Sequence, residues 1–529
     1  MATSYAGSLA RYGWGITSEN RVEKKIPDMD AFLARHARQI AGVSSCFDRV
    51  VIMGSLLDIC YPDGMAAHLS AHDFRLFDFT KWAEPLRDQI RVNAEALATQ
   101  EGLEIEFIRR KNFRKEERIK EIVAERGEHP GLVHIFSAME PCRSFRPWHD
   151  KQTHRTFLQS RQAQCLHYYF YFIDKDLGLC YLRVPTWAPF RLQFYFNGHN
   201  WLARRLEKRG IDFTLLDNAF IEISDYDQAQ KIADRFDVKR LHKKLDSYSR
   251  KLCPVVKRFR SGVHWSIMQV EYATDLVFEN RAALAALYEP LVRTAVHAVK
   301  AENVATFLGR KLHGNFKDEL GNDFNTRIEG TRIRHHMGPA SIKMYDKHGL
   351  VLRIETTANT VSFFKHHRRV DHRDGTSSKK IAPVRKTIYS LGVMRELLGA
   401  SNHRYLAFLS QLDEPDSGLR QMDKISRPVR REGRSHRGFN LFHGDDLDLF
   451  VAIARGEHRI SGFRNRDIQS PLDRNGGQVS RLLKRLRVHG LIKKIGRTYK
   501  YYLTRLGRST IACALRLREE TVVPALAKC

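Results

Sequence analysis

The sequence predicts a multidomain protein of the α/β or α+β class, in which a large basic region with a mixed sheet precedes a smaller C-terminal domain. Its 529 residues exceed one ordinary core, because about 100–200 residues per domain is typical. Segments with strand-like and helix-like patterns follow one another along the chain. Hydrophobic residues make up 43% of the chain and aromatic residues 10%, which suits packed cores and argues against wholesale disorder.

The charge of the chain points to nucleic acid as its partner. There are 89 Lys and Arg residues against 60 Asp and Glu residues, a formal net charge of +29. Such a surplus creates a long-range positive field, and nucleic acid is the commonest stable partner for it. We therefore expect nucleic-acid binding. The alternative is a basic protein whose charge serves solubility.

The sequence does not predict a membrane or secreted protein. No apolar run approaches the roughly 18 residues that span a bilayer, and the N-terminal segment lacks a signal-peptide pattern. The eight cysteines are scattered and include no C-x-x-C pair, so neither structural zinc nor a disulfide framework is expected. We expect a reducing, cytoplasmic location and no membrane partner.

Residues 1–130 are expected to form a mainly helical region. The segments "DMDAFLARHARQIAG" and "KWAEPLRDQIRVNAEALATQEG" have helical patterns, and "RRKNFRKEERIKEIVAERG" is highly charged. Between the first two, an apolar run from Val50 to Met53 predicts either a buried strand or a short helix, closed by the turn "YPDG".

Residues 131–412 are expected to form a mixed α/β region. Within 131–224, short segments rich in aromatic or β-branched residues are bounded by Gly, Pro, Asn or Asp, which predicts strands. A helix, "HNWLARRLEKRG", lies among them and ends at Gly210. Residues 225–310 are expected to be mostly helical. Farther on, "SIKMY" and "LVLRIETT" flank "DKHG" and predict a hairpin.

Two stretches, 365–386 and 413–440, are rich in Gly, Ser, Pro, Arg and Lys, which predicts linkers or loops that face nucleic acid. We expect the second stretch to be a basic linker and a domain boundary. Residues 441–529 then form a separate C-terminal domain.

The C-terminal domain is expected to contain three helices and a hairpin. The helices are "DDLDLFVAIARGE", "ISGFRNRDIQSPL" and "NGGQVSRLLKRLRVHG", and "LIKKIGRTYKYYLT" forms two strands around Gly496. In the third helix Val479, Leu482, Leu483 and Leu486 fall at i, i+3, i+4 and i+7, which makes one apolar stripe. Over residues 445–524 this order resembles the winged helix-turn-helix domain of MarR-like regulators.

The resemblance implies that the third helix enters the major groove of DNA and that the basic hairpin holds phosphates. Neither segment contains an acidic residue. The alternative is a winged helix used for protein contacts or dimerisation, with a basic face that is only solvated. The side chains implied for DNA contact are Gln478, Ser480, Arg481, Lys484, Arg485 and Arg487 on the helix, and Lys493, Lys494, Arg497 and Lys500 on the hairpin.

The segment from "HYYFYFID" to "LLDNAF" reads as three strands, a helix and a fourth strand. Asp174 and Asp176 end the first strand, and Asp217 borders the fourth. This order resembles the ribonuclease-H-like core of DDE transposases, which implies a Mg²⁺ site on these three carboxylates. The catalytic residues would be Asp174, Asp217 and Glu271, the last on a predicted helix, "HWSIMQVEYATDLVF". The alternative is that "DKDLG" is only a hairpin turn and that Asp217 lies in a loop.

The hairpin around "DKHG" also resembles the "YDK…LRxE" pattern of some phage and plasmid replication initiators. Those enzymes generally use a His–hydrophobic–His metal pair and a Tyr nucleophile, and the chain contains no such triplet. We therefore expect Tyr345 to be a packed strand residue. Arg353 and Glu355 are expected to form a cross-strand ion pair rather than an active site.

The sequence supports three functional hypotheses. The first is a DNA-binding protein, either a regulator or an accessory factor of a mobile element, whose winged helix anchors on duplex DNA. The second is a metal-dependent nuclease or transposase-like enzyme that uses the winged helix for targeting. The third is an RNA-binding protein whose aromatic-rich strands stack on single-stranded bases. Walker, G-x-G-x-x-G, G-x-S-x-G and H-E-x-x-H motifs are absent from the sequence. Mg²⁺ is expected as a cofactor only if the chain is a nuclease.

Overall fold

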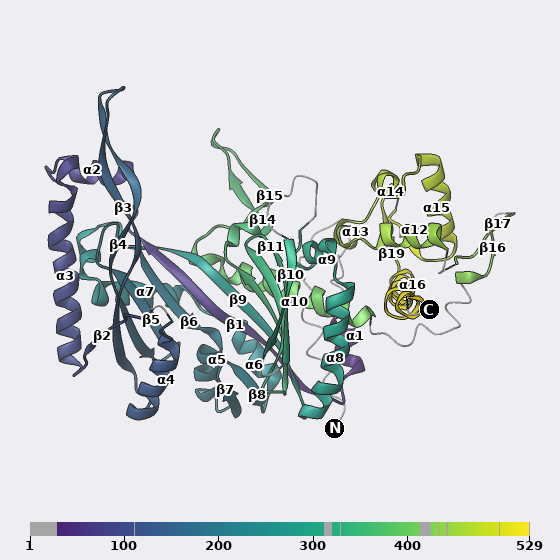
Figure 1. Cartoon of the computed structure of the whole chain (residues 1–529), viewed down its shortest axis with the longest axis horizontal. Helices are drawn as coiled ribbons and strands as arrows, with labels where there is room; N and C mark the ends of the chain where they lie inside the picture. Colours follow the sequence, from purple (N-terminus) through teal and green to yellow (C-terminus); the bar gives the residue numbers. More distant parts are fainter. Residues whose placement is uncertain are drawn as a thin grey trace. The chain divides into compact units, whose positions relative to one another are not determined.

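The structure, a computed structural model, describes residues 29–110, 112–310, 320–327, 330–412, 425–431, 433–440, 443–496 and 498–527 (Figure 1). It combines helices with mixed β-sheet, as predicted for an α/β multidomain protein. The chain divides into two compact units. Unit 1 comprises the residues up to Val43, Ala273–Thr356 and Leu397–Cys529, and unit 2 comprises Ser44–Tyr272 and Thr357–Glu396. The divisions differ from the expected boundaries at 130/131 and 412/413 because each unit is assembled from separated segments.

Unit 2 is built on a mixed sheet with the strand order β9-β1-β6-β5-β4-β3-β2. β2 pairs with β3 in parallel, whereas the pairs from β3 to β6, and β6 with β1, are antiparallel. Phe170, Phe194 and Phe196 are fully buried, so these aromatic residues form a core and not an exposed stacking surface. The strands are β1 (Ile40–Ser55), β2 (Ile105–Phe107), β3 (Gly131–Asp150), β4 (Arg155–Asp174), β5 (Gly178–Pro185), β6 (Leu192–Asn197) and β9 (His264–Phe278); unit 2 holds residues 44–55 of β1 and 264–272 of β9.

Strand β1 settles an alternative that the sequence left open, and strand β9 corrects a prediction. The run from Val50 to Met53 belongs to β1, so the strand alternative is confirmed. The segment "HWSIMQVEYATDLVF" was expected to be a helix and is strand β9, so Glu271 lies on a strand. Most residues of β9 are buried, and the seven from Tyr272 to Phe278 all are. A strand buried on both faces loses the period-two alternation by which strands are recognised.

Helices pack around the sheet of unit 2. Trp82, Leu86 and Ile90 are buried on one side of α3, four residues apart. Gly210, which has a φ of 64°, follows α5 closely, in agreement with the predicted helix end. The helices are α2 (Pro62–Ser70), α3 (Phe79–Gln100), α4 (Lys115–Arg126), α5 (Gly198–Glu207), α6 (Tyr226–Ala233) and α7 (Val238–Leu252), and β7 (Phe213–Leu216) pairs with β8 (Ala219–Ile223).

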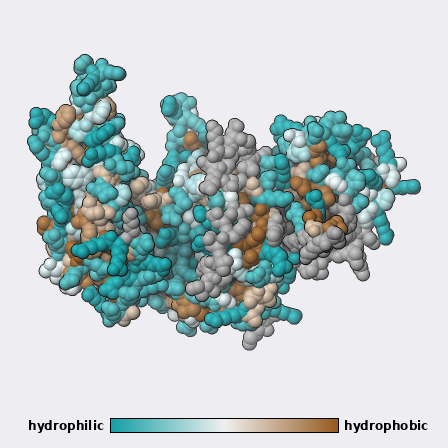
Figure 2. All heavy atoms as spheres, in the orientation of Figure 1, coloured by the Kyte–Doolittle hydropathy of each residue, from teal (hydrophilic) through white to brown (hydrophobic). Residues whose placement is uncertain are grey.

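Two antiparallel ribbons extend from unit 2 (Figure 1). β3 and β4 pair with each other over their whole length, although β5 pairs with β4 only from His167 onward. We call the outer part, residues 139–166, the β3–β4 ribbon, and its tip is hydrophilic (Figure 2). β14 (Lys365–Asp371) and β15 (Ser377–Pro383) form the second ribbon, within a stretch that was expected to be a linker or loop.

Unit 1 contains strands in the order β10-β11-β12-β13-β9, of which β9 contributes residues 273–278. The predicted hairpin around "DKHG" is confirmed, with His348 and Gly349 at positive φ in the turn. The strands are β10 (Leu320–Arg327), β11 (Gly330–Met337), β12 (Ala340–Lys347) and β13 (Val351–Ala358), and the helices are α1 (Met29–Arg35), α8 (Arg281–Ala298), α9 (Ala301–Phe307) and the later part of α10 (Leu391–Leu412). Among the described residues no helix has the length and apolar character needed to cross a bilayer.

Residues 443–527, which we call the C-terminal module, also belong to unit 1. The helices and the hairpin expected there are present, and an isolated bridge joins Phe463 to Tyr501 of the hairpin. Before the module, β16 (Val429–Arg431) and β17 (Arg434–His436) form a short hairpin in the stretch expected to be a linker. The elements of the module are α12 (Gly444–Ala454), α13 (Gly456–Ser461), α14 (Asn465–Leu472), α15 (Gly476–Val488), β18 (Ile492–Lys494), β19 (Tyr501–Leu503), α16 (Arg505–Arg516) and α17 (Val523–Leu526).

Candidate nucleic-acid interface

Helix α15 has one side in the core of the C-terminal module and one side in solvent. Val479, Leu483 and Leu486 are buried in the same cluster as residues of α12, and Leu482 packs against that cluster. This confirms the apolar stripe predicted for the helix. Arg481 and Arg487 are exposed. The helix therefore presents positive charge on the side that the core does not use.

The first turn of α15 is held by reciprocal hydrogen bonds. Gln478 N donates to Asn475 Oδ1, and Asn475 N donates to Gln478 Oε1, both at 3.0 Å. This arrangement is a capping box, which satisfies backbone donors at the start of a helix. Ser480 Oγ accepts a hydrogen bond from Asn465 Nδ2 at 2.8 Å, which ties α15 to α14. Gln478 and Ser480 thus take part in hydrogen bonds that orient the helix.

The β18–β19 hairpin carries cations next to an exposed aromatic ring. Lys493 is exposed, and Lys494 and Lys500 are half-buried. Tyr499 is 79% exposed, and Lys494 Nζ lies 5.4 Å from the centre of its ring. Arg497, predicted to contact DNA, lies outside the described residues. From Arg474 to Arg518 the sequence contains no Asp or Glu, so nothing acidic offsets these cations within that stretch.

Arg485 is not part of the exposed surface, which corrects its predicted role in DNA contact. Its guanidinium forms an ion pair with Asp446 of α12 and is 10% exposed. It also donates hydrogen bonds to the carbonyl oxygens of Arg437 and Gly438, and it lies 3.8 Å from the centre of the Phe439 ring. Arg485 therefore joins α12, α15 and the segment before the module, and it is structural.

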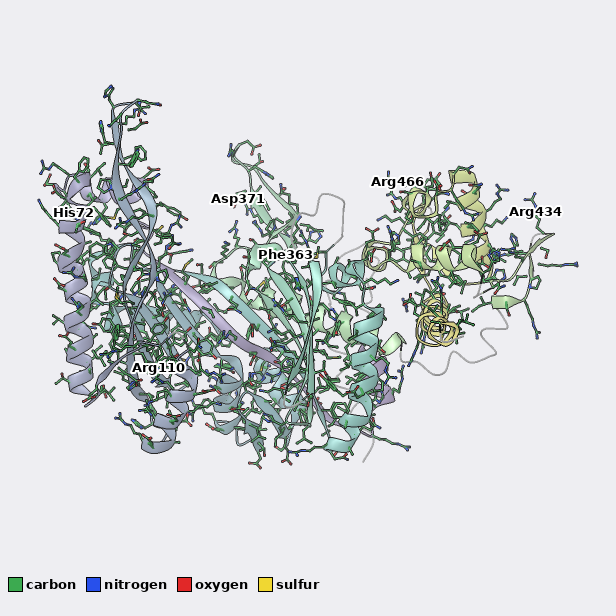
Figure 3. The ribbon with its side chains drawn as sticks, viewed as in Figure 1. His72, Arg110, Phe363, Asp371, Arg434 and Arg466 are labelled. Carbon is green, nitrogen blue, oxygen red and sulfur yellow. The ribbon has the colours of Figure 1, made fainter. Side chains whose placement is uncertain are left out.

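Further exposed cations, not predicted from the sequence, lie on the segment before the module and on α14. Arg430, Arg431 and Arg434 of the β16–β17 hairpin are exposed, and Figure 3 shows Arg434 at its tip. The contacts of Arg485 with 437–439 attach this hairpin to the module. Arg466 of α14 has a 75% exposed side chain and points outward in Figure 3. The clustered arginines were visible in the sequence, but the burial of Phe439 that anchors them was not.

Asp174 and Asp176, predicted metal ligands, lie on a pocket of about 530 Å³ in unit 2, among lysine and arginine side chains. Asp174 Oδ2 pairs with Lys244 Nζ at 2.6 Å and accepts from Tyr248 Oη, and its Oδ1 accepts two backbone amides. Asp176 pairs with Lys208 at 2.8 Å and with Arg240 at 2.5 Å. We call this group the Asp–Lys–Arg cluster. Its lysine and arginine side chains neutralise both carboxylates, which does not suit a Mg²⁺ site.

The pKa values of both carboxyl groups fall below the usual range. Burial alone would raise the pKa of Asp174, but hydrogen bonds from Lys244 and Tyr248 outweigh it. Burial likewise opposes ionisation of Asp176, and Lys208 and Lys244 lower its pKa well below normal. Both groups are thus firmly ionised, and their charge is balanced by protein cations.

Asp217 and Glu271 do not join this cluster. Asp217 lies in the turn between β7 and β8 with a φ of 52°, and its carboxylate pairs with Lys120 at 2.5 Å. Glu271 lies on β9, where one of its oxygens is within 4.8 Å of a carboxylate oxygen of Asp48. Among the described residues, Asp174, Asp176 and Asp217 form no three-ligand group. The predicted Mg²⁺ site and catalytic trio are therefore not assembled, and the turn-and-loop alternative describes Asp174, Asp176 and Asp217.

Tyr345 is a packed strand residue, as expected. It is 9% exposed, and its hydroxyl donates to Glu355 Oε2 at 2.6 Å. Glu355 also pairs with Lys343 at 2.6 Å. Arg353 is fully buried and binds both carboxylate oxygens of Asp275 at 2.6 Å. Arg353 and Glu355 thus each form a cross-strand ion pair, but with different partners and not with each other.

The described residues of unit 1 therefore carry exposed cations on α15, on the β18–β19 hairpin and on the β16–β17 hairpin. We call this set of cations the basic surface. Comparisons with known proteins add no guide to its ligand. No family model, no curated protein and no solved structure matches the chain.

Proposed function

We propose that the C-terminal module is a winged helix-turn-helix that binds duplex DNA, and that the chain is a DNA-binding protein. In this proposal α14 and α15 are the helix-turn-helix, with α15 as the recognition helix, and β18–β19 is the wing. The chain would act as a regulator or as an accessory factor of a mobile element.

The observation that carries the proposal is the division of α15 into an apolar and a basic side. Val479, Leu483 and Leu486 fix the helix to the core, so Arg481 and Arg487 face outward from a rigid element. An α-helix fits the major groove, where arginine can donate to two acceptors of guanine. A basic hairpin beside it can contact phosphates, which fixes the register of the protein on DNA.

Protein binding by the same surface has less support. Protein interfaces are depleted of lysine at their centres and carry apolar anchors. On the hairpin of this surface Tyr499 is an exposed aromatic side chain, and the cation of Lys494 lies beside its ring. The nuclease alternative also has less support, because the three predicted aspartates are divided between two ion-paired places.

The experiment is a titration of the full chain against labelled duplex DNA, single-stranded DNA and RNA of equal length, at two salt concentrations, with and without Mg²⁺. We expect the tightest binding to duplex DNA, weakening as salt rises, because phosphate contacts release counterions. Tighter binding to RNA or single strands would contradict the proposal. Cleavage that depends on Mg²⁺ would favour the nuclease alternative.

A further inference from the structure

A second positively charged site lies in unit 2, at the base of the β3–β4 ribbon. A pocket of about 150 Å³ opens there, and its lining includes Arg143, Arg183 and Arg191 together with His167, Trp187 and Gln193. Arg143 comes from the ribbon, His167 from the adjoining part of β4, and Arg183 from β5, and the remaining three residues come from the segment before β6 and from β6 itself. No carboxylate lines this pocket.

The arginines of the pocket have donors that the protein leaves unused. The Nε atoms of Arg183 and Arg191 are buried and have no hydrogen-bond partner. Arg191 donates from Nη2 to Cys60 O at 3.4 Å, a long contact, and Arg183 pairs from Nη2 with Glu140 at 2.8 Å. Arg143 is exposed, and it forms no ion pair with the residues that the structure describes. Buried donors are almost always satisfied in folded proteins, so unpaired ones at a pocket point to a missing acceptor.

The charge of the pocket is likewise unbalanced. Burial lowers the pKa of Arg191, and the nearby charge of Arg143 lowers it further. His167 adds no charge, because burial and the nearby charge of Arg183 lower its pKa to about 4. The contact of its Nδ1 with Cys165 O at 3.0 Å acts in the opposite direction and is outweighed. Two cations that repel each other in a half-buried pocket favour the entry of an anion.

The backbone next to Arg191 is held in an uncommon conformation. Phe190 has a φ of 53°, in the left-handed region that bulky residues rarely adopt, and its side chain is fully buried. Such strain persists where the surrounding structure determines it, and it clusters at ligand sites. The packing of Phe190 thus restrains Arg191 at the pocket.

We propose that this pocket binds one phosphate group, carried by a nucleotide or by a nucleic-acid strand. The planar guanidinium group matches the oxygen atoms of phosphate with two parallel N–H donors. Arg191 and Arg143 supply charge that has no carboxylate partner, and Arg183 adds its free Nε. The proposal goes beyond DNA binding by the C-terminal module, because every residue of the pocket belongs to unit 2.

The test uses the full chain in phosphate-free buffer and isothermal titration with inorganic phosphate, a nucleoside 5′-monophosphate, and single strands with a 5′-phosphate or a 5′-hydroxyl. The variants are Arg143→Gln and Arg191→Gln. Arg146→Gln is the matched control, because Arg146 lies on the same ribbon but bonds to Gln159 and does not line the pocket. Circular dichroism checks that each variant is folded. If Arg191→Gln does not fold, Arg143→Gln still tests the proposal.

We expect the wild type and Arg146→Gln to bind phosphate alike, and the two pocket variants to bind about tenfold more weakly or worse. Pocket-dependent binding of the monophosphate and of 5′-phosphorylated strands alone would assign a terminal phosphate. Equal, pocket-dependent binding of both strands would assign a backbone phosphate. A folded wild type that binds none of these ligands, or an Arg143→Gln variant that binds like wild type, would overturn the proposal. An Arg481→Ala variant should leave phosphate binding by the pocket unchanged. Failure of the pocket proposal can therefore be distinguished from failure of DNA binding by the module.

Discussion

Arg485 and Asp446 form a buried ion pair with two parallel bonds, Nη1 to Oδ1 at 2.6 Å and Nη2 to Oδ2 at 2.8 Å. Asp446 is in the first turn of α12 and Arg485 is near the end of α15. The same guanidinium holds the Arg437 and Gly438 carbonyl groups. The position of the proposed recognition helix therefore depends on this pair.

Replacing Arg485 by alanine should unfold or loosen the C-terminal module. Removing one partner of a buried pair leaves the other charge uncompensated, at a cost of about 3–5 kcal/mol. Hydrogen–deuterium exchange of the full chain should show faster exchange in α12 and α15. Arg487→Ala, two residues farther along, is the control, and it should change stability by no more than about 0.5 kcal/mol. Equal exchange in both variants would show that the pair is not structural.

The stability of the module should fall in acid. Burial alone would raise the pKa of Asp446, but hydrogen bonds from Arg485 and from Asn440 N lower it below normal. A carboxyl group with a depressed folded pKa stabilises the fold fully above its unfolded pKa of about 3.9, and the stabilisation is lost as pH falls through the folded value. Below about pH 4 the free energy of unfolding of the module should accordingly fall more steeply with decreasing pH in wild type than in Asp446→Asn. Identical pH profiles would contradict this assignment.

Asp174→Ala should lower the stability of unit 2 and should not remove a metal-dependent activity. The substitution removes the carboxylate that accepts hydrogen bonds from two backbone amides and from the side chains of Lys244 and Tyr248. We expect this loss to lower the free energy of unfolding by about 1–3 kcal/mol. Denaturant unfolding and a Mg²⁺-dependent cleavage assay on the same preparation test this. Asp217→Ala is the control, because its 51% exposed carboxylate should contribute little. A stable Asp174→Ala protein that has lost Mg²⁺-dependent cleavage would revive the nuclease hypothesis.

Lys493→Ala should weaken binding to every duplex sequence by about the same factor. A phosphate contact carries no sequence information, and its loss should reduce the slope of log affinity against log salt by about one. Fluorescence anisotropy at several salt concentrations measures both quantities. Lys81→Ala, which removes a 74% exposed lysine of unit 2, should leave the slope unchanged. Loss of affinity on one sequence alone would mean that Lys493 contacts a base.

Local patterns predicted elements with a clear periodicity or a clear turn. The apolar stripe of α15 was correctly placed because its periodicity follows from one buried side. The "DKHG" hairpin was correctly placed by its turn residues, although β13 is buried throughout. Strand β9 was taken for a helix because seven successive residues, Tyr272 to Phe278, are all buried, so this half of the strand has no alternation of apolar and polar residues. The assembly of each unit from separated segments has no local signal at all.

The candidate site was predictable only in part, because some of its side chains have partners that are distant in sequence. The exposed Arg481 and Arg487 follow from the helical period. Arg485 was placed on the same side, because nothing in the sequence reveals that Asp446, 39 positions earlier, would meet it. Asp174 and Asp176 have the right type for metal ligands, but the lysines that neutralise them are Lys208, just after α5, and Lys244 of α7, and both are distant in sequence.

DNA recognition by α15 is tested most directly by the affinity of the full chain for a preferred duplex. The proteins compared are wild type, a double variant with Arg481→Ala and Arg487→Ala, and Arg75→Ala. Arg75, whose side chain is 85% exposed on unit 2, is the matched control. We expect the double variant, while fully folded, to bind about tenfold to a hundredfold more weakly, and Arg75→Ala to bind like wild type. A folded double variant with wild-type affinity would contradict α15 as the recognition helix.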